Sequence, residues 1–201
     1  IAGYSYVPNK DKQRIQKAVV LMKQQNCKAI YLNAGTNLYY FTGTKWNASE
    51  RMVGALLFED ESIQYIVPKF EDGTFKKFML VEGALNCWEE HESPSALLGT
   101  ILKKKNIQSG NIAIDESAAY FLVDGVVKAN PNYTFVNAQP ITAGCRMQKS
   151  ANEIAIIQQA KEITMVVPKA AARILHPVTE VNTVVDFIHQ ARIKAGISSG
   201  S

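Results

Sequence analysis

The chain has 201 residues, of which 47% are hydrophobic and 20% charged, and its 22 Lys and Arg against 18 Asp and Glu give a net charge of +4. This composition is ordinary for a globular protein and leaves room for one domain, or for one domain and part of a second. The small, scattered charge excess excludes a nucleic-acid partner. The one basic run, 103–105, is expected at a solvated helix end. No apolar run approaches the roughly 20 residues of a membrane helix, so no membrane partner is expected.

The cysteines indicate a reducing compartment. Cys27, Cys87 and Cys145 lie far apart and form no Cys-x-x-Cys pair, which argues against a zinc knuckle or a disulfide framework. We therefore expect a cytoplasmic protein. Because the chain begins at Ile1 instead of Met, a leader could have been removed, and an exported or periplasmic location stays open.

Hydrophobic periodicity predicts alternating helices and strands over residues 1–140, which we take as the first domain. A helix is expected from an N-cap at Asn9 to about Asn26, and an apolar pair at 52–58 and 62–67 is typical of a β-hairpin. The other expected elements are a loop or short helix over 70–81, strands over 28–32, 84–88, 111–115 and 133–136, and helices opening at Ser93-Pro94 and spanning 117–128. This order predicts an α/β fold whose mixed β-sheet is flanked by helices on both faces.

The character of the chain changes after residue 140. Residues 141–150 are expected to be a linker, and 151–201 to open a second, truncated domain, because two amphipathic helices alone do not make a fold.

Capping residues and a proline mark these two helices. Ser150 and Glu153 form a capping box at the start of the first. Pro168 is expected to kink or interrupt that helix, and Thr179 can cap the second. Val181 and Val185 are expected on the apolar face of the second helix.

Catalytic motifs are missing from the sequence: no Gly-x-Ser-x-Gly elbow, phosphate loop or Gly-x-Gly-x-x-Gly occurs. His91 lies among acidic residues with no second His at metal-binding spacing, which favours a solvated loop over a metal site. His176 is expected at a helix end and His189 on a polar face. Cys145, with no evident base nearby, is expected to be a small buried hydrophobe. We therefore predict no catalytic or metal-binding residue in this chain.

Three segments in a fixed order carry a family resemblance. They are Gly35 to Gly43 with Trp46 and 50–52, Trp88 to Pro94, and Thr142 to Met147 with 149–150 and 153–154. They resemble the creatinase-type N-terminal domain of aminopeptidase P and Xaa-Pro dipeptidase (prolidase). The third segment is similar to the link that leads into the first helices of the catalytic domain. That domain has the α+β pita-bread fold.

The resemblance implies a metallopeptidase that hydrolyses the peptide bond before proline. It implies two divalent metal ions, manganese or cobalt, which share a water or hydroxide that attacks the scissile carbonyl. Their ligands are two Asp, one His and two Glu of the pita-bread domain, and no residue of this chain matches them. We therefore expect this segment alone to be inactive.

The resemblance also implies an assembly role, in a homodimer or higher homo-oligomer acting on proline-containing peptides. In relatives the N-terminal domain helps to wall the substrate cleft of a neighbouring subunit. On that basis Tyr39, Tyr40, Trp46 and Arg51 are expected on or near the wall, since aromatic rings suit a prolyl peptide and an Arg can hold a carboxylate. Core packing is the alternative for Trp46 and the favoured role for the two tyrosines.

Three other interpretations stay open. One is a pita-bread relative that has lost its metals and acts as a protein-binding module, and another is a creatinase-like amidinohydrolase. The third is a stand-alone nucleotide-binding α/β domain, although the Gly-rich strand-to-helix turn of that class does not occur here.

Overall fold

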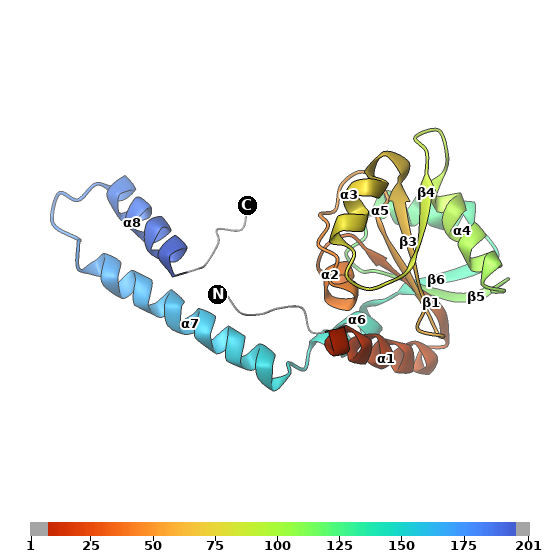
Figure 1. Ribbon diagram of the computed structural model, residues 1–201, viewed down its shortest axis with the longest axis horizontal. Helices are drawn as coiled ribbons and strands as arrows, with labels where there is room; N and C mark the ends of the chain where they lie inside the picture. Colours follow the sequence, from red (N-terminus) through yellow and green to blue (C-terminus); the bar gives the residue numbers. More distant parts are fainter. Residues whose placement is uncertain (1–7, 196–201) are drawn as a thin grey trace. The chain divides into compact units, whose positions relative to one another are not determined.

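A computed structural model describes residues 8–195 of the chain (Figure 1). The chain divides into two compact units between Met147 and Gln148. We call residues 8–147 the α/β unit and residues 148–195 the helical unit.

The strands of the α/β unit form a mixed sheet, as the sequence predicts. Within the described residues the sheet has six strands in the order β4-β3-β2-β1-β5-β6. Strand β1 pairs in parallel with β5 and antiparallel with β2, and the β3–β4 and β5–β6 pairs are parallel. The strands are β1 (Cys27–Asn33), β2 (Gly54–Phe58), β3 (Ile63–Pro68), β4 (Ala84–Trp88), β5 (Gly110–Ile114) and β6 (Tyr133–Asn137).

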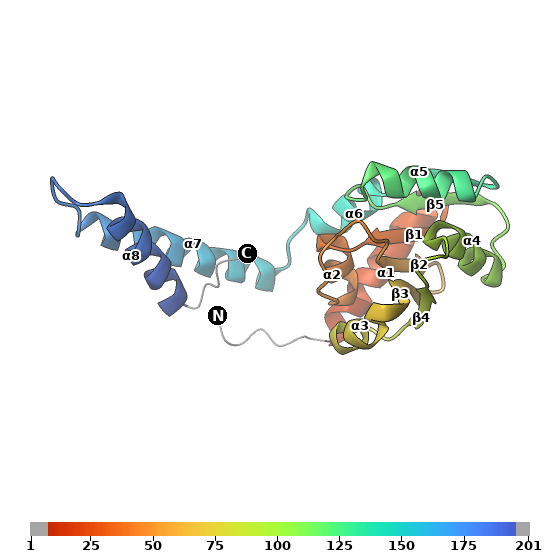
Figure 2. The same ribbon diagram turned by 90° about the horizontal axis from the view of Figure 1, so that it is seen from above.

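Helices cover both faces of this sheet, which confirms the predicted architecture (Figure 2). One apolar core lies beneath α1 (Pro8–Gln24), α2 (Thr36–Thr42), α3 (Asp72–Phe78) and α6 (Gln139–Arg146). The other lies beneath α4 (Pro94–Lys104) and α5 (Tyr120–Ala129). A short 3-10 helix, η1 (Lys69–Glu71), precedes α3.

Local signals explain where two of these helices begin. Asn9 is expected to be the N-cap of the first helix, but α1 starts at Pro8, so Asn9 lies inside the helix. Helix α5 starts three residues later than the expected 117, because Ser117 donates its backbone N–H to the Asp115 carboxylate at 2.8 Å and forms a turn there.

The segment expected to be a linker differs most from its prediction. Residues 141–146 belong to α6, and Ile141, Thr142 and Cys145 are buried at helical spacing. The capacity of this face to bury apolar surface explains why the α/β unit extends to Met147 instead of ending at residue 140.

The helical unit consists of α7 (Ala151–Ala172) and α8 (Val181–Lys194). The predicted capping box of Ser150 and Glu153 is present at the start of α7. Pro168 does not interrupt α7, since a helix can lose one N–H donor and continue when its neighbours stay paired. Thr179 does not cap α8: its hydroxyl accepts the His176 N–H at 2.7 Å, and Glu180 is the N-cap residue.

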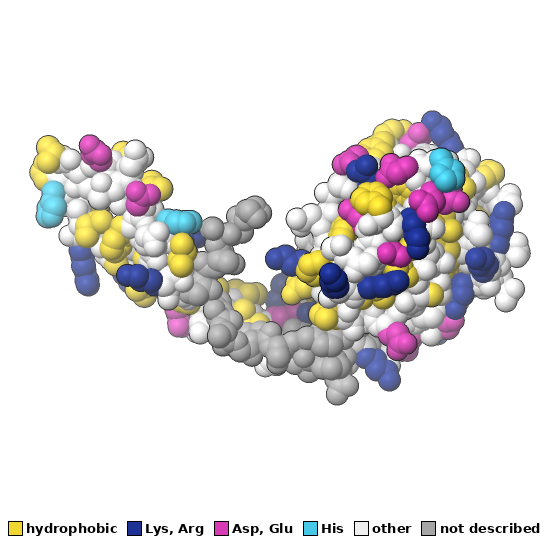
Figure 3. All heavy atoms as spheres, turned by 45° about the horizontal axis from the view of Figure 1, so that its top comes forward, with side chains coloured by type: hydrophobic (Ala, Val, Ile, Leu, Met, Phe, Trp, Pro, Cys, Tyr) yellow, Lys and Arg dark blue, Asp and Glu magenta, His cyan; other side chains and the backbone are white. Residues whose placement is uncertain are grey.

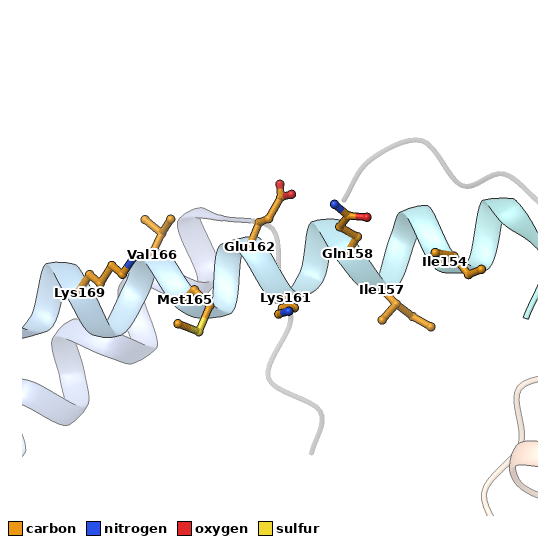
Figure 4. A pocket seen from close by; sticks show the side chains of 8 residues that line it. All are labelled: Ile154, Ile157, Gln158, Lys161, Glu162, Met165, Val166 and Lys169. Carbon is orange, nitrogen blue, oxygen red and sulfur yellow. The ribbon is translucent and has the colours of Figure 1, made fainter.

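The helical unit leaves much apolar surface uncovered. On α7, Ile154, Ile157, Met165 and Val166 are exposed, and Figure 4 shows these side chains along the helix. Val181 and Val185, expected on the buried face of α8, are exposed as well. Within the described residues, no helix is long and apolar enough to cross a membrane.

The basic run at the end of α4 is only partly solvated. Lys103 and Lys104 are exposed as expected, but the Lys105 ammonium lies 2.6 Å from the Asp60 carboxylate and 5.1 Å from the centre of the Phe58 ring. Burial works against the ionised form of Asp60, yet hydrogen bonds from Lys105 and Ser62 outweigh it and lower the pKa of Asp60 from 3.8 to about 2.

We predict that Lys105→Met lowers the free energy of unfolding at pH 7 by at most about 1 kcal/mol, because the pair is partly exposed. The folded pKa of Asp60 is depressed, so the contribution is present above about pH 4 and is lost as the pH falls towards 2. Urea denaturation at both pH values measures the difference. Lys104→Met is the matched control, and a loss of equal size at pH 2 would contradict the assignment.

Candidate functional site

Residues 43–53, which we call the Trp46 loop, connect α2 to β2. Gly43 ends α2 in the left-handed conformation, with φ of 67°, and donates its N–H to the Tyr39 carbonyl at 2.9 Å. A Cβ at Gly43 would lie 2.9 Å from Cδ1 of Leu80. The left-handed turn favours glycine, and a larger residue would also have to displace the Leu80 side chain, so the loop leaves α2 through a defined turn.

Trp46 anchors the loop to α3. Its half-buried ring lies 5.2 Å from the Phe75 ring and 6.1 Å from the Phe78 ring, centre to centre. Phe75 is fully buried, whereas Phe78 is exposed. One edge of the Trp46 indole therefore packs on the core and another remains near the surface.

Arg51 lies at the far end of the same loop, next to η1. Its Nε donates to Glu90 at 2.9 Å, its Nη1 pairs with Glu50, and its guanidinium lies 5.3 Å from the centre of the Phe70 ring. The hydrogen bond with Glu90, and then its charge, raise the pKa of Arg51. Phe70 itself is 63% exposed. Arg51 and Phe70 thus form a cationic and aromatic surface beside the loop.

The two tyrosines of α2 point to different surroundings. Tyr39 is 56% exposed. Tyr40 donates its hydroxyl to the Cys145 carbonyl at 3.0 Å, and the Arg14 guanidinium lies 3.9 Å from the centre of its ring. Tyr40 therefore binds α2 to α1 and α6, in the packing role favoured by the sequence.

The four residues expected at a cleft wall do not form one group. Trp46 and Arg51 share the Trp46 loop, Tyr39 is exposed on α2, and Tyr40 faces α1 and α6. The surface of the α/β unit in Figure 3 mixes hydrophobic side chains with charged ones. Phe70, Phe78 and Leu80, which the sequence did not single out, add exposed apolar surface close to the loop.

A second polar feature lies where β1 and β5 end. The chain leaves the parallel strands β1 and β5 towards opposite faces of the sheet, through α2 and α5 respectively. Such a switch point is where open α/β sheets commonly bind ligands. Here it holds a hydrogen-bonded group, which we call the Asp115 cluster: the backbone N–H of Asn33 and the side chains of Asn37, Asp115, Glu116, Ser117, Thr142 and Arg146.

Asp115 is the centre of this cluster and is 2% exposed. Its Oδ2 accepts the backbone N–H of Asn33 at 3.0 Å, and its Oδ1 accepts from Asn37 at 2.9 Å and from the Ser117 N–H and hydroxyl at 2.8 and 2.7 Å. Burial, and then the charge of Asp115, raise the pKa of Tyr31. These internal donors occupy the carboxylate, which argues against a nucleotide at the switch point.

The sequence predicts no role for the Asp115 cluster. It places Asp115 at the end of a strand and Arg146 in a family motif. A usable signal was present, because an acidic residue that directly follows a buried strand must find donors when the fold closes over it.

Metal binding has no support within the described residues, where no group of three or more His, Cys, Asp or Glu is placed to hold an ion. The two-metal centre implied by the resemblance does not fit these side chains, and no hydrolytic step is assigned to them. Cys145 is buried, as predicted, and burial raises its pKa to about 11 although Lys17 lowers it slightly.

We predict that Asp115→Asn lowers the free energy of unfolding by about 2–4 kcal/mol, because an amide nitrogen would face donors that now meet a buried carboxylate. Urea denaturation at neutral pH measures the change. Asp124→Asn, which removes an exposed carboxylate paired with Lys128, is the control and is expected to cost no more than about 0.5 kcal/mol. Equal losses in the two variants would contradict the central place of Asp115.

The known proteins that this chain resembles are named as dipeptidases and prolidases. YkvY of Bacillus subtilis (strain 168), which is named as a dipeptidase, is 25% identical over 151 residues, covering 75% of this chain and 41% of that protein. The structure of dipeptidase PepE from Mycobacterium ulcerans matches with a TM-score of 0.83 and 17% identity, over 94% of this chain and 51% of that one. A prolidase from Thermococcus sibiricus matches with a TM-score of 0.76 and 19% identity, over 90% and 49%.

These coverages mean that the chain spans about half the length of the relatives it matches, or somewhat less. At such identities the solved structures show a shared fold. The family description Creatinase/Prolidase N-terminal domain matches residues 14–148, most of the chain and nearly all of the α/β unit. The chain therefore belongs to the family of creatinase and prolidase N-terminal domains.

Proposed function

We propose that this chain is the N-terminal part of a metal-dependent Xaa-Pro peptidase, an aminopeptidase P or Xaa-Pro dipeptidase that hydrolyses the peptide bond before proline. The family match over residues 14–148 carries the proposal, and the names of the relatives, dipeptidase and prolidase, supply the reaction. The manganese or cobalt ions of the reaction are assigned to a catalytic domain beyond the α/β unit, which the helical unit begins.

Within that enzyme, the α/β unit serves assembly and shapes the substrate cleft. The Trp46 loop faces the cleft of a neighbouring subunit in a homodimer or larger homo-oligomer. Support comes from the exposed aromatic surface around the loop, since a prolyl ring packs well on an aromatic face. The three free cysteines support a reducing, cytoplasmic location.

Arg51 is the residue of this surface that suits a substrate carboxylate. Glu90 and Glu50 occupy its Nε and Nη1, while its Nη2 has no hydrogen-bond partner among the described residues. One guanidinium nitrogen is therefore left to bind the C-terminal carboxylate of a dipeptide. The pairing with Glu90 orients the guanidinium before substrate binds, but the negative charge of Glu90 repels the substrate carboxylate.

We predict that Arg51→Met in the full-length enzyme raises KM for an Xaa-Pro dipeptide about tenfold, the loss expected for one charge-assisted hydrogen bond. Methionine retains packing against Phe70, so kcat is expected to change little. Steady-state kinetics with Mn²⁺ measures both constants. Glu90→Gln is the matched opposite, expected to lower KM because it removes a carboxylate that repels the substrate.

The corresponding Xaa-Pro amide serves as control substrate, since it lacks the carboxylate and its KM is expected to be unchanged in both variants. An equal rise in KM for dipeptide and amide would contradict the role of Arg51. The 201-residue chain assayed alone with Mn²⁺ is expected to give no hydrolysis. Activity in that assay would contradict the placement of the reaction outside the α/β unit.

A further inference from the structure

We propose that Asn37 is a positioning residue for the Trp46 loop: it locks the first turn of α2 to the ends of β1, β5 and α6, and the far end of α2 presents the loop. The consequence for substrate binding rests on the proposed function, whereas the consequence for the loop does not.

Asn37 uses its amide in both directions. Its Oδ1 accepts from Nη1 of Arg146 at 2.8 Å, and its Nδ2 donates to Asp115 at 2.9 Å and to Glu116 at 3.1 Å. The side chain is 2% exposed. Among side chains of this size, only asparagine offers an acceptor to a cation and donors to two carboxylates.

Helix α2 depends on such anchors because it has little stability of its own. It contains seven residues, and Gly35 at its N-cap provides no side-chain hydrogen bond. Isolated helices of this length do not form in water. Its orientation is therefore set by the contacts of Asn37, by the hydroxyl of Tyr40 on the Cys145 carbonyl, and by buried Leu38 and Phe41.

The far end of α2 passes this orientation to the loop. The Thr42 hydroxyl donates to the Leu38 carbonyl at 2.7 Å and accepts the Thr44 N–H at 3.2 Å. Gly43 follows in its fixed left-handed turn, and Trp46 packs on α3 three residues later. A shift of the first turn of α2 thus moves the segment that holds Trp46.

The charges around Asn37 make this role testable by pH. The groups that face its amide are Asp115 and Glu116 from the β5–α5 connection and Arg146 from α6. Asn37→Asp replaces the donor with a third carboxylate, which two neighbouring carboxylates repel when it is ionised. Asp115 and Glu116 favour the protonated form of the introduced carboxyl, whereas Arg146 favours the ionised form; once protonated, the carboxyl can donate again. The disturbance is therefore largest at high pH and smaller at low pH.

The experiment is acrylamide quenching of tryptophan fluorescence in the 201-residue chain at pH 8 and pH 5. The chain has two tryptophans, Trp46 and Trp88. Trp88 is buried, so the quencher reports mainly on the half-buried Trp46; Trp88 also donates its Nε1 hydrogen to the carbonyl of Met52 in the same loop, at 3.1 Å, so a change at either tryptophan reports on this loop. Far-UV circular dichroism checks that each variant is folded.

Asn37→Asp is expected to raise the quenching constant about twofold at pH 8 and to return towards the wild-type value at pH 5. Asn132→Asp, which changes an exposed asparagine in the same way, is expected to leave it unchanged at both pH values. Unchanged quenching in folded Asn37→Asp would overturn the proposal. Should that variant fail to fold at pH 8, Asn37→Ala is used instead. This variant is expected to raise the quenching constant equally at both pH values, and an unchanged constant would again overturn the proposal.

A kinetic measurement separates this proposal from the proposed function. In the full-length enzyme, Asn37→Asp is expected to raise KM about fivefold at pH 8 with kcat nearly unchanged, because the loop binds substrate and does not react with it. Raised quenching with an unchanged KM would support the positioning role and contradict the cleft-wall function of the loop. Unchanged quenching with a raised KM would contradict the positioning role alone.

Discussion

The α/β unit depends on one buried carboxyl group. A carboxyl group with 2% exposure is stable only where donors surround it, and Asp115 obtains them from the end of β1, the first turn of α2 and the turn before α5. The adjacent parallel strands β1 and β5 send the chain to opposite faces of the sheet at this point. The hydrogen bonds of Asp115 therefore connect the two helical layers. The crevice that many α/β domains use for a ligand is here part of the framework.

This framework explains how the Trp46 loop is held in place. A rigid centre holds a short helix, and the helix ends in a loop that carries an indole and a guanidinium near exposed aromatic rings. Accuracy in such a site comes from the support behind it. Two of the solved structures that share this fold, the dipeptidase and the prolidase, are about twice as long as this chain.

Local signals predicted the fold well, because strands with continuous apolar runs and the caps at Ser93 and Ser150 act over a few residues. One error came from tertiary packing, because α6 forms where its apolar face meets the core, and another came from α7, which tolerates Pro168 and continues through it. The site was harder to predict. Trp46 and Arg51 could be named from a motif, but the pairing of Arg51 with Glu90 and of Asn37 with Asp115 joins residues 39 and 78 positions apart, which periodicity does not reveal.

The most direct test of the account is a crystal structure of the full-length protein with an Xaa-Pro dipeptide bound. We expect the Trp46 loop of one subunit to lie within about 4 Å of the dipeptide in a neighbouring subunit, the separation of atoms in contact. We also expect Arg51 to face the carboxylate of the dipeptide. A dipeptide bound with no part of this loop near it would contradict the account and leave the loop with a purely structural role.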